Sequence, residues 1–338
     1  GLVTSGPPEG GAPTWGGCLA SALESQASQE RAAASASYWH ILELLSDARG
    51  FNPSTRQAFY SQFSDPALHS ALLGAVAARG PWDVTVRRCL RNLARSHDLR
   101  RPLQEAVPAL VADLLDDALA QESAAALCNL ACHSENKERA VECGVVRRLV
   151  QRLARPRQSA VVAEDVVACL GVLTGGYEQG MAALFEVAAT DGRQEVFGPL
   201  FACLEAGGES SPALQCLVLD VVGGLCAGSP QFKVWAVQET SLVKTGLPPL
   251  LRSDAADVRK AALEITNLLV EAEGFIEVFQ RADGVNALQH VLYRDRPQIG
   301  DANASNPFQF MAPGMRGGRR EPTQRDLAQT LLSKILII

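Results

Sequence analysis

The sequence predicts an all-α protein built as an α-solenoid, in which helical repeats stack one on the next. From about Leu19 onward, apolar residues recur at helical spacing, and no stretch alternates apolar and polar residues over the length of a strand. One short helical pattern also recurs at intervals of 37 to 52 residues. A period near 40 residues in helical sequence is typical of a solenoid, because a single repeat cannot bury its own apolar stripe.

The recurring pattern is a short helix with its apolar residues on one face, such as Val86, Cys89, Leu90 and Leu93 in the first copy. The five copies lie at residues 85–96, 124–135, 165–176, 217–228 and 261–272. The equivalent positions in the five copies are Asn92, Asn129, Val172, Gly224 and Asn267. We expect these helices to stack in chain order, because each apolar face needs a neighbour to cover it.

A second kind of segment lies between these copies and consists of a polar helix end, a Gly and an apolar helix. Examples are residues 140–153, 242–253 and 281–292, with the glycines at Gly144, Gly246 and Gly284. A Gly permits a sharp bend between two helices because it has no Cβ. Each repeat is therefore expected to contain a short helix, a bend and a longer helix.

The ends of the chain depart from the repeat pattern. Residues 1–17 contain six Gly and three Pro and are predicted to be a flexible tail. Residues 18–81 are predicted to form N-terminal capping helices, and residues 82–293 the repeats. Residues 294–325 contain four Pro and a basic run and are predicted to be a long flexible loop, followed by a C-terminal helix at 326–338.

The order short helix, Gly, Leu-rich helix and helix ending in Asn-Leu resembles the armadillo repeat over about residues 82–294. This resemblance implies a right-handed superhelix of helical repeats, and HEAT-type repeats of similar length are the alternative. In armadillo proteins the third helix of each repeat lines a concave groove. Its Asn residues bind the backbone of an extended peptide or hold neighbouring helices together, and Asn92, Asn129 and Asn267 match that position.

The peptide groove of nuclear import receptors also has a Trp four residues before this Asn. Here the corresponding residues are Arg88, Ala125 and Leu263. We therefore do not expect the chain to recognise nuclear localisation signals.

A second resemblance covers residues 169–206 and 231–251, which are similar to the armadillo region of diaphanous-type formins. In that family the region binds a Rho-type GTPase and an autoinhibitory amphipathic helix. The chain has no Pro-rich actin-assembly segment and no catalytic formin domain, and its repeats continue past the point where the formin region ends. A GTPase-effector or autoinhibitory module is accordingly the alternative function.

Composition and charge narrow the class of partner. The chain is 47% hydrophobic and 20% charged, which is typical of a globular protein, and its net charge of -6 argues against general nucleic-acid binding. There is no run of 18 apolar residues and no signal-peptide pattern, so we expect no membrane insertion. A cytoplasmic location is predicted, with a nuclear or cytoskeletal one left open. The missing initiator Met suggests a fragment or a processed chain.

The positive charge is concentrated in one stretch. Residues 87–157 carry 13 basic and 9 acidic side chains, a net charge of +4, which leaves -10 for the rest. Arg88, Arg91 and Arg95 recur at steps of three and four, so they are expected to project from one helix face beside Asn92 and to bind carboxylates of a partner. A solvated arginine face is the alternative. A secondary basic patch is predicted at Arg147, Arg148 and Arg152.

The sequence contains no recognisable catalytic or metal-binding motif. The nine cysteines fall almost entirely within apolar periodic stretches, which favours reduced thiols in a core over disulfides. Cys128 and Cys132 could lie on one helix face, but no other pair stands at a spacing that completes a metal site. Dinucleotide, phosphate-loop, zinc-protease and serine-hydrolase signatures were not found. We expect no catalytic residues, no metal and no cofactor.

Together these features predict a non-catalytic scaffold that binds a protein partner through the concave surface of the solenoid. The partner would present an acidic or amphipathic segment, with a small GTPase as the alternative. Reversing Arg88, Arg91 and Arg95 to Glu is expected to abolish partner capture without changing helical content or melting.

Overall fold

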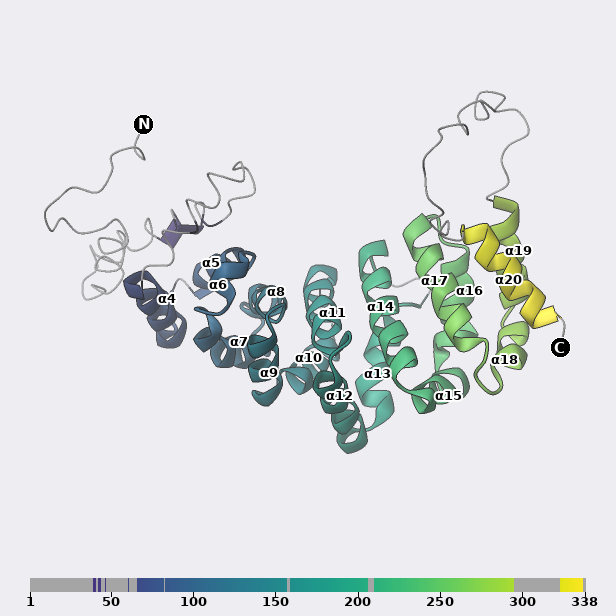
Figure 1. Cartoon of the computed structure of the whole chain (residues 1–338), viewed down its shortest axis with the longest axis horizontal. Coiled ribbons are helices and arrows are strands. Elements are labelled where there is room, and N and C mark those ends of the chain that lie inside the picture. Colours follow the sequence, from purple (N-terminus) through teal and green to yellow (C-terminus); the bar gives the residue numbers. More distant parts are fainter. Residues whose placement is uncertain are drawn as a thin grey trace, which may run out of the picture. The chain divides into compact units, whose positions relative to one another are not determined.

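The computed structural model describes residues 39–40, 42–43, 46, 60, 66–81, 83–156, 159–205, 210–294 and 323–336. This part of the chain consists of helices joined by turns and contains no strand, which confirms the all-α prediction (Figure 1). The predicted tail at residues 1–17 lies outside the described residues, as do residues 295–322 of the predicted loop.

The chain divides into two compact units, residues 1–192 and 193–338. The helices of the first unit are α4 (Pro66–Ala78), α5 (Asp83–Leu93), α6 (His97–Arg100), η2 (Gln104–Ala106), α7 (Val107–Asp113), α8 (Ala120–Leu130), α9 (Ser134–Glu142), α10 (Val145–Leu153), α11 (Ala160–Thr174) and α12 (Glu178–Asp191). Those of the second unit are α13 (Arg193–Ala202), α14 (Pro212–Gly228), α15 (Pro230–Gln238), η3 (Leu242–Gly246), α16 (Leu247–Leu251), α17 (Ala256–Leu269), α18 (Phe275–Arg281), α19 (Gly284–Arg294) and α20 (Gln324–Leu336).

In the first unit, the three helices that carry the recurring pattern form one row. Helix α8 packs against α5 on one side and α11 on the other (Figure 1). Helices α7 and α10 pack behind this row, against α8 and α11 respectively. The core between the two layers is apolar, with Leu90, Leu127 and Leu170 no more than 1% exposed. The equivalent positions Asn92 and Asn129 thus lie on adjacent helices.

The second unit uses the same arrangement of one helix on the next. Helix α14 packs against α17, and α17 also contacts α16 and α20. An aromatic cluster fills the space between α13 and α15, where the ring centroids of Phe197 and Phe232 lie 4.9 Å apart. Helix α20 begins two residues before the predicted C-terminal helix and packs on α17 and α19, so it covers apolar surface of both.

Local residues explain where several helices begin. Ser159, Ser211 and Ser229 each accept a hydrogen bond from the backbone N–H three residues ahead, which caps α11, α14 and α15. Gly144 lies between α9 and α10 with a φ of 76°, so its role in the bend is as expected. Gly246 differs: its φ of -86° is helical, and α16 follows η3 with no residue between them.

A buried ion pair fastens the first helices of the first unit together. The Arg87 and Asp113 side chains are fully buried, and Arg87 Nε donates to Asp113 Oδ2 at 2.8 Å. Arg87 also donates to Asp83 and to the carbonyl of Val76, while Arg79 donates to the other oxygen of Asp113. Arg87 is therefore part of the core and is unavailable to a partner.

Among the described residues, no single helix has both the length and the apolar composition needed to cross a membrane. Helices α11 and α12 are long and apolar enough for this only when they are taken together, and the chain bends by 118° between them.

Candidate partner-binding face

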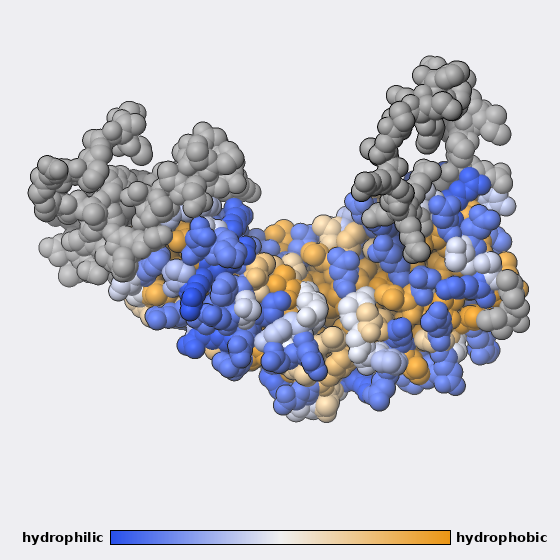
Figure 2. Space-filling view, in the orientation of Figure 1, coloured by the Kyte–Doolittle hydropathy of each residue, from blue (hydrophilic) through white to orange (hydrophobic). Residues whose placement is uncertain are grey.

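Four of the predicted residues, Arg88, Arg91, Arg95 and Asn129, lie on the side of the α5–α8–α11 row that is not covered by α7 and α10. Partly or fully exposed side chains on this side come from all three helices and the turn after α5. We call them the α5–α8–α11 face: Arg88, Arg91, Arg95, Ala125, Cys128, Asn129, Asp165, Ala168 and Val172. Figure 2 shows a hydrophilic surface over α5 and α6, and more apolar surface next to it over α8 and α11.

Arg88 lies at the α5 end of this face and is held by two carboxylates. Its Nη1 donates to Glu43 Oε1 at 2.6 Å, and its Nε donates to Glu122 Oε1 at 3.0 Å. The hydrogen bonds that Arg88 donates to Glu43 and Glu122 raise the pKa of Arg88. Its side chain remains 37% exposed. Arg88 is thus fixed in position while part of its guanidinium still faces solvent.

Arg91 shares Glu122 with Arg88. Arg91 Nη1 lies 2.8 Å from Glu122 Oε2, and the Glu122 side chain is only 8% exposed. A carboxylate buried to this extent needs close cationic partners, because desolvation penalises its charge. Glu122 therefore ties α8 to α5 through two guanidinium groups, and part of the predicted cluster has an internal structural role.

Arg95 differs from the expectation that all three arginines project from one helix. Helix α5 ends at Leu93, and the N–H of Arg95 bonds to the carbonyl of Asn92 in a tighter turn. Arg95 is exposed in this turn before α6. The chain leaves the helix here because Ser96 introduces the next one in an extended conformation. Arg95 consequently belongs to the rim of the face.

The Asn residues make contacts within the chain. Asn92 is 1% exposed, and its Nδ2 donates to Ser46 Oγ at 3.2 Å. Asn129 Nδ2 donates to the backbone carbonyl of Arg91 at 3.0 Å, which links α8 to the end of α5. Asn267 is exposed on α17 and accepts a hydrogen bond from Lys334 of α20 at 3.4 Å. In this structure Asn92 and Asn129 hold neighbouring segments, as in the second of the two roles expected of them.

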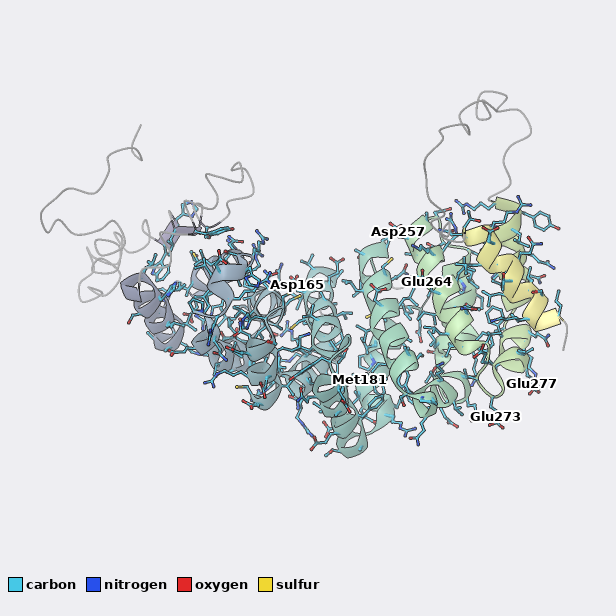
Figure 3. All side chains as sticks on the ribbon, viewed as in Figure 1. Asp165, Met181, Asp257, Glu264, Glu273 and Glu277 are labelled. Atoms are coloured by element: carbon cyan, nitrogen blue, oxygen red, sulfur yellow. The ribbon has the colours of Figure 1, made fainter. Side chains whose placement is uncertain are left out.

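Asp165 adds an ionisable group to the α11 side of the face (Figure 3). Burial raises the pKa of Asp165 to about 6, and the nearby carboxylates of Glu122 and Glu164 also raise it. Arg91 acts in the opposite direction and favours the charged form. The face therefore carries cationic groups at α5 and an easily protonated carboxyl group at α11.

The secondary basic patch is dispersed in the structure. Arg147 donates to both carboxylate oxygens of Asp191 at 2.9 Å, and Arg152 is nearly buried against Asp117. Hydrogen bonds from Arg152 and Arg155 lower the pKa of Asp117. Arg148 is exposed and forms no ion pair within the described part of the chain. Only one of the three predicted guanidinium groups thus points into solvent unpaired.

Most of the described thiols are buried or half-buried, and Cys132 is exposed. All eight cysteines in the described ranges are free, and burial raises the pKa of Cys128 to about 11 and that of Cys89 to about 12. Such thiols are almost fully protonated at neutral pH and are poor nucleophiles. No group of three or more His, Cys, Asp or Glu side chains in the described ranges could hold a metal ion.

Two residues that tie the first unit together, Glu122 beside the site and Asn136 in α9, were not identified from the sequence. Glu122 is the one charged residue in the Ala-rich helix α8, and this isolation was a signal that it needs a partner. Asn136 is fully buried and donates to the carbonyls of Arg100 and Leu130 at 2.8 and 3.1 Å. Nothing in the sequence around Asn136 distinguishes it from a surface residue.

Comparison with known proteins adds evidence on the fold. No protein-family model matches the chain, and no curated protein matches it. The crystal structure of an engineered protein is similar to it, with a TM-score of 0.58, 17% sequence identity, and coverage of 75% of this chain and 96% of the other. At this level of identity the likeness concerns the fold alone.

Proposed function

We propose that the chain is a non-catalytic interaction scaffold, an armadillo-like solenoid that binds a peptide or helix of a partner protein. The α5–α8–α11 face would be its binding surface. The observation that carries this proposal is the placement of partly exposed Arg88 and Arg91 at one end of a row of helices. Partly exposed small apolar side chains, Ala125, Ala168 and Val172, continue that row.

This combination favours a partner segment with an acidic end and an apolar face. Guanidinium groups that are already oriented by carboxylates lose little conformational entropy when they bind another carboxylate. The apolar side chains of α8 and α11 would cover the apolar face of a helix, as in helix-in-groove recognition. With this function we propose a cytoplasmic location, and the alternatives are a nuclear or a cytoskeletal one.

The experiment is binding of acidic, helix-forming peptides selected from a display library against the full chain. Arg95→Glu is the informative variant because Arg95 is exposed at the rim of the face. We expect it to weaken binding about tenfold, since like charges would oppose the acidic end of the peptide. Arg193→Glu is the matched control, because Arg193 is exposed in the second unit and forms no ion pair within the described part of the chain. Equal effects of the two variants would contradict the proposal.

Reversing the charge of Arg88, Arg91 and Arg95 together would affect stability as well as binding, contrary to the expectation from the sequence. It would leave Glu122, only 8% exposed, facing two new carboxylates. Melting is therefore expected to fall, because an unpaired buried charge is strongly destabilising. A loss of binding in that variant would mix unfolding with loss of the site.

The GTPase-effector alternative makes a different prediction with the same protein. A Rho-type GTPase would bind the full chain only when loaded with a GTP analogue. Capture of acidic peptides without any nucleotide dependence would favour the scaffold proposal over this alternative.

A further inference from the structure

One carboxylate of the α5–α8–α11 face has no cation of its own. Asp165 of α11 is partly exposed and forms no ion pair within the described part of the chain. Arg91 favours the charged form of Asp165, but the Nη1 of Arg91 lies 2.8 Å from Glu122 Oε2 and is paired with that carboxylate. The negative charge of Asp165 is therefore left for solvent or for a partner to balance.

Apolar side chains flank Asp165 along α11. Val161, Asp165, Ala168 and Val172 follow one another at steps of four, three and four residues, so they share one face of the helix. Val161 is 52% exposed, as few large apolar side chains in the described ranges are. Helix α8, which packs on α11, presents the small and partly exposed side chain of Ala125. Asp165 is thus a carboxylate within a strip of accessible apolar surface.

The surroundings of Asp165 make its charge unfavourable for the fold. Burial and the nearby carboxylates of Glu122 and Glu164 raise the pKa of Asp165 to about 6. At neutral pH the side chain is still mainly ionised, and this ionisation lowers stability. Asp165→Asn keeps the size of the side chain and removes the charge, so it should be more stable than the wild type. A charge that weakens the fold and has no internal counterpart is typical of a functional site.

A Lys or Arg side chain of a partner would complement this strip. Long cationic side chains bury their methylene stems on apolar surface while the charged head stays at the edge. Such a stem would cover Val161 and Ala168, and its head would reach Asp165. Because this carboxylate is already partly desolvated, its attraction to a cation is stronger than in bulk water. The α5 end of the same face, with Arg88 and Arg95, favours a carboxylate instead.

We propose that Asp165 recognises a Lys or Arg side chain of the partner, and that the α5–α8–α11 face binds a segment with charges of both signs. Its carboxylate would lie at Arg88 and Arg95, and its cation at Asp165. This inference rests on the proposed function and specifies the partner. A purely acidic segment would leave Asp165 unpaired and would bind more weakly.

The packing of the helices sets the distance between the two charges of the partner. Helix axes in contact lie about 8–10 Å apart, and α8 separates α5 from α11, so Arg88 and Asp165 arise from backbones about 16–20 Å apart. An extended segment rises about 3.3 Å per residue and alternates its side chains, so it would place the two charges about six residues apart. A helical segment would place them about 11 to 13 residues apart.

The test begins with a display library of random 16-residue peptides, selected on the full wild-type chain. We expect the peptides that bind to share an Asp or Glu and a Lys or Arg at one of these two spacings. One such peptide is then synthesised with a fluorescent label. Asp165→Asn is expected to bind it about tenfold more weakly, although urea denaturation should show this variant to be the more stable protein.

A charge exchange tests the pairing directly. Asp165→Lys is expected to lower the affinity for the labelled peptide about tenfold or more. The peptide with its cation replaced by Glu should recover binding to Asp165→Lys and bind the wild type poorly. Asp220→Lys is the matched control, because Asp220 lies on α14 in the second unit and burial raises its pKa as well. This control should leave both affinities unchanged. Circular dichroism checks that each variant is folded, and Asp165→Asn keeps the test available if Asp165→Lys does not fold.

The outcomes for the two proposals are separable. If the selected peptides share no cation, or if Asp165→Asn binds as tightly as the wild type, recognition by Asp165 is overturned and the scaffold function stands. Weaker binding by Asp165→Asn together with lower stability would also overturn it, because Asp165 would then have a structural role. If no peptide binds the wild type, the scaffold function fails and this inference fails with it.

Discussion

At the scale of single residues, the chemistry of the face depends on neighbours that are distant in sequence. Arg88 has carboxylate partners 45 and 34 residues away, at Glu43 and Glu122. Asp165 lies near Arg91 and Glu122, but burial outweighs the cation and keeps its pKa high. Both pKa values are raised, but the rise favours the charged form of Arg88, which donates hydrogen bonds to carboxylates, and the neutral form of Asp165, which mainly loses water.

Asp165→Asn gives a pH-dependent prediction. The folded chain holds the proton of Asp165 more tightly than the unfolded chain, since its pKa is about 6 against an unfolded value of about 3.9. The wild type should therefore lose stability relative to the variant as the pH rises from about 4 to 6, and the difference should stay constant above that. After allowance for solvent screening, we expect about 1 kcal/mol at pH 8. Urea denaturation from pH 4 to pH 8 measures it.

Asp254→Asn is the control for this titration, because the pKa of Asp254 is shifted in the opposite direction from that of Asp165. The hydrogen bond from Arg294 lowers the pKa of Asp254, so the charged form stabilises the fold. This stabilisation is present above the unfolded pKa and is lost as the pH falls through the folded pKa. A pH profile of the same sign for both variants would contradict the assignment.

At the scale of elements, the row of helices depends on close backbone contacts as well as on apolar stripes. Gly180 near the start of α12 is buried, and a Cβ built there would lie 1.9 Å from the carbonyl oxygen of Leu173 in α11. Gly74 in α4 has nothing within 4 Å of such a Cβ. Two helical glycines of the same unit therefore serve different purposes, and only one of them is required by packing.

Substitution of these two glycines by Ala should have opposite effects on the free energy of unfolding. Gly180→Ala is expected to lower it by about 1–3 kcal/mol, because α12 would have to move away from α11. Gly74→Ala is expected to raise it by about 0.5–1 kcal/mol, because Ala has the higher helix propensity and nothing blocks its methyl group. Chemical denaturation of the two variants compares them directly, and a stabilising Gly180→Ala would refute the close contact.

The sequence predicts elements better than it predicts the partners of side chains. The five repeated helices are found as α5, α8, α11, α14 and α17, because an apolar stripe at helical spacing is a local property. The prediction that Gly246 lies at a bend was wrong, since its φ is helical and the residues that follow it form a helix. Arg87 opens the basic stretch 87–157, yet it is fully buried against Asp113, a partner 26 residues away that no local pattern predicts.

At the scale of the whole molecule, net charge misrepresents the surface. Residues 87–157 contain 13 basic side chains, but several of them are paired with carboxylates of the same stretch. Arg87 pairs with Asp113, Arg88 and Arg91 pair with Glu122, and Arg152 pairs with Asp117. The cationic surface offered to a partner is therefore smaller than the count and lies mainly at the α5 end of the face.

Each of the two units has its own core. We therefore expect a substitution in the core of one unit to loosen that unit first. Asp113→Ala would leave the buried guanidinium of Arg87 without its main partner and should cost about 3 kcal/mol or more. Hydrogen exchange should speed up first in residues 66–192, with residues 193–336 retaining protection longer.

The matched control for Asp113→Ala is Glu277→Ala. Glu277 forms an ion pair with Arg281 in which both side chains are largely exposed, so removing it should change stability very little. Equal destabilisation by the two variants, or simultaneous loss of protection in both units, would contradict the prediction.

The sequence by itself determined the all-α class and the position of the repeated helices, because periodic apolar residues act through local geometry and burial. It also located the stretch in which arginines concentrate. Only the tertiary structure decided which of those arginines face solvent and what they contact. Ion pairs and hydrogen bonds join residues 26 to 46 positions apart, as Arg87 with Asp113 and Asn92 with Ser46 do. Such partners come together only when successive helices stack, and no local pattern encodes which of them meet.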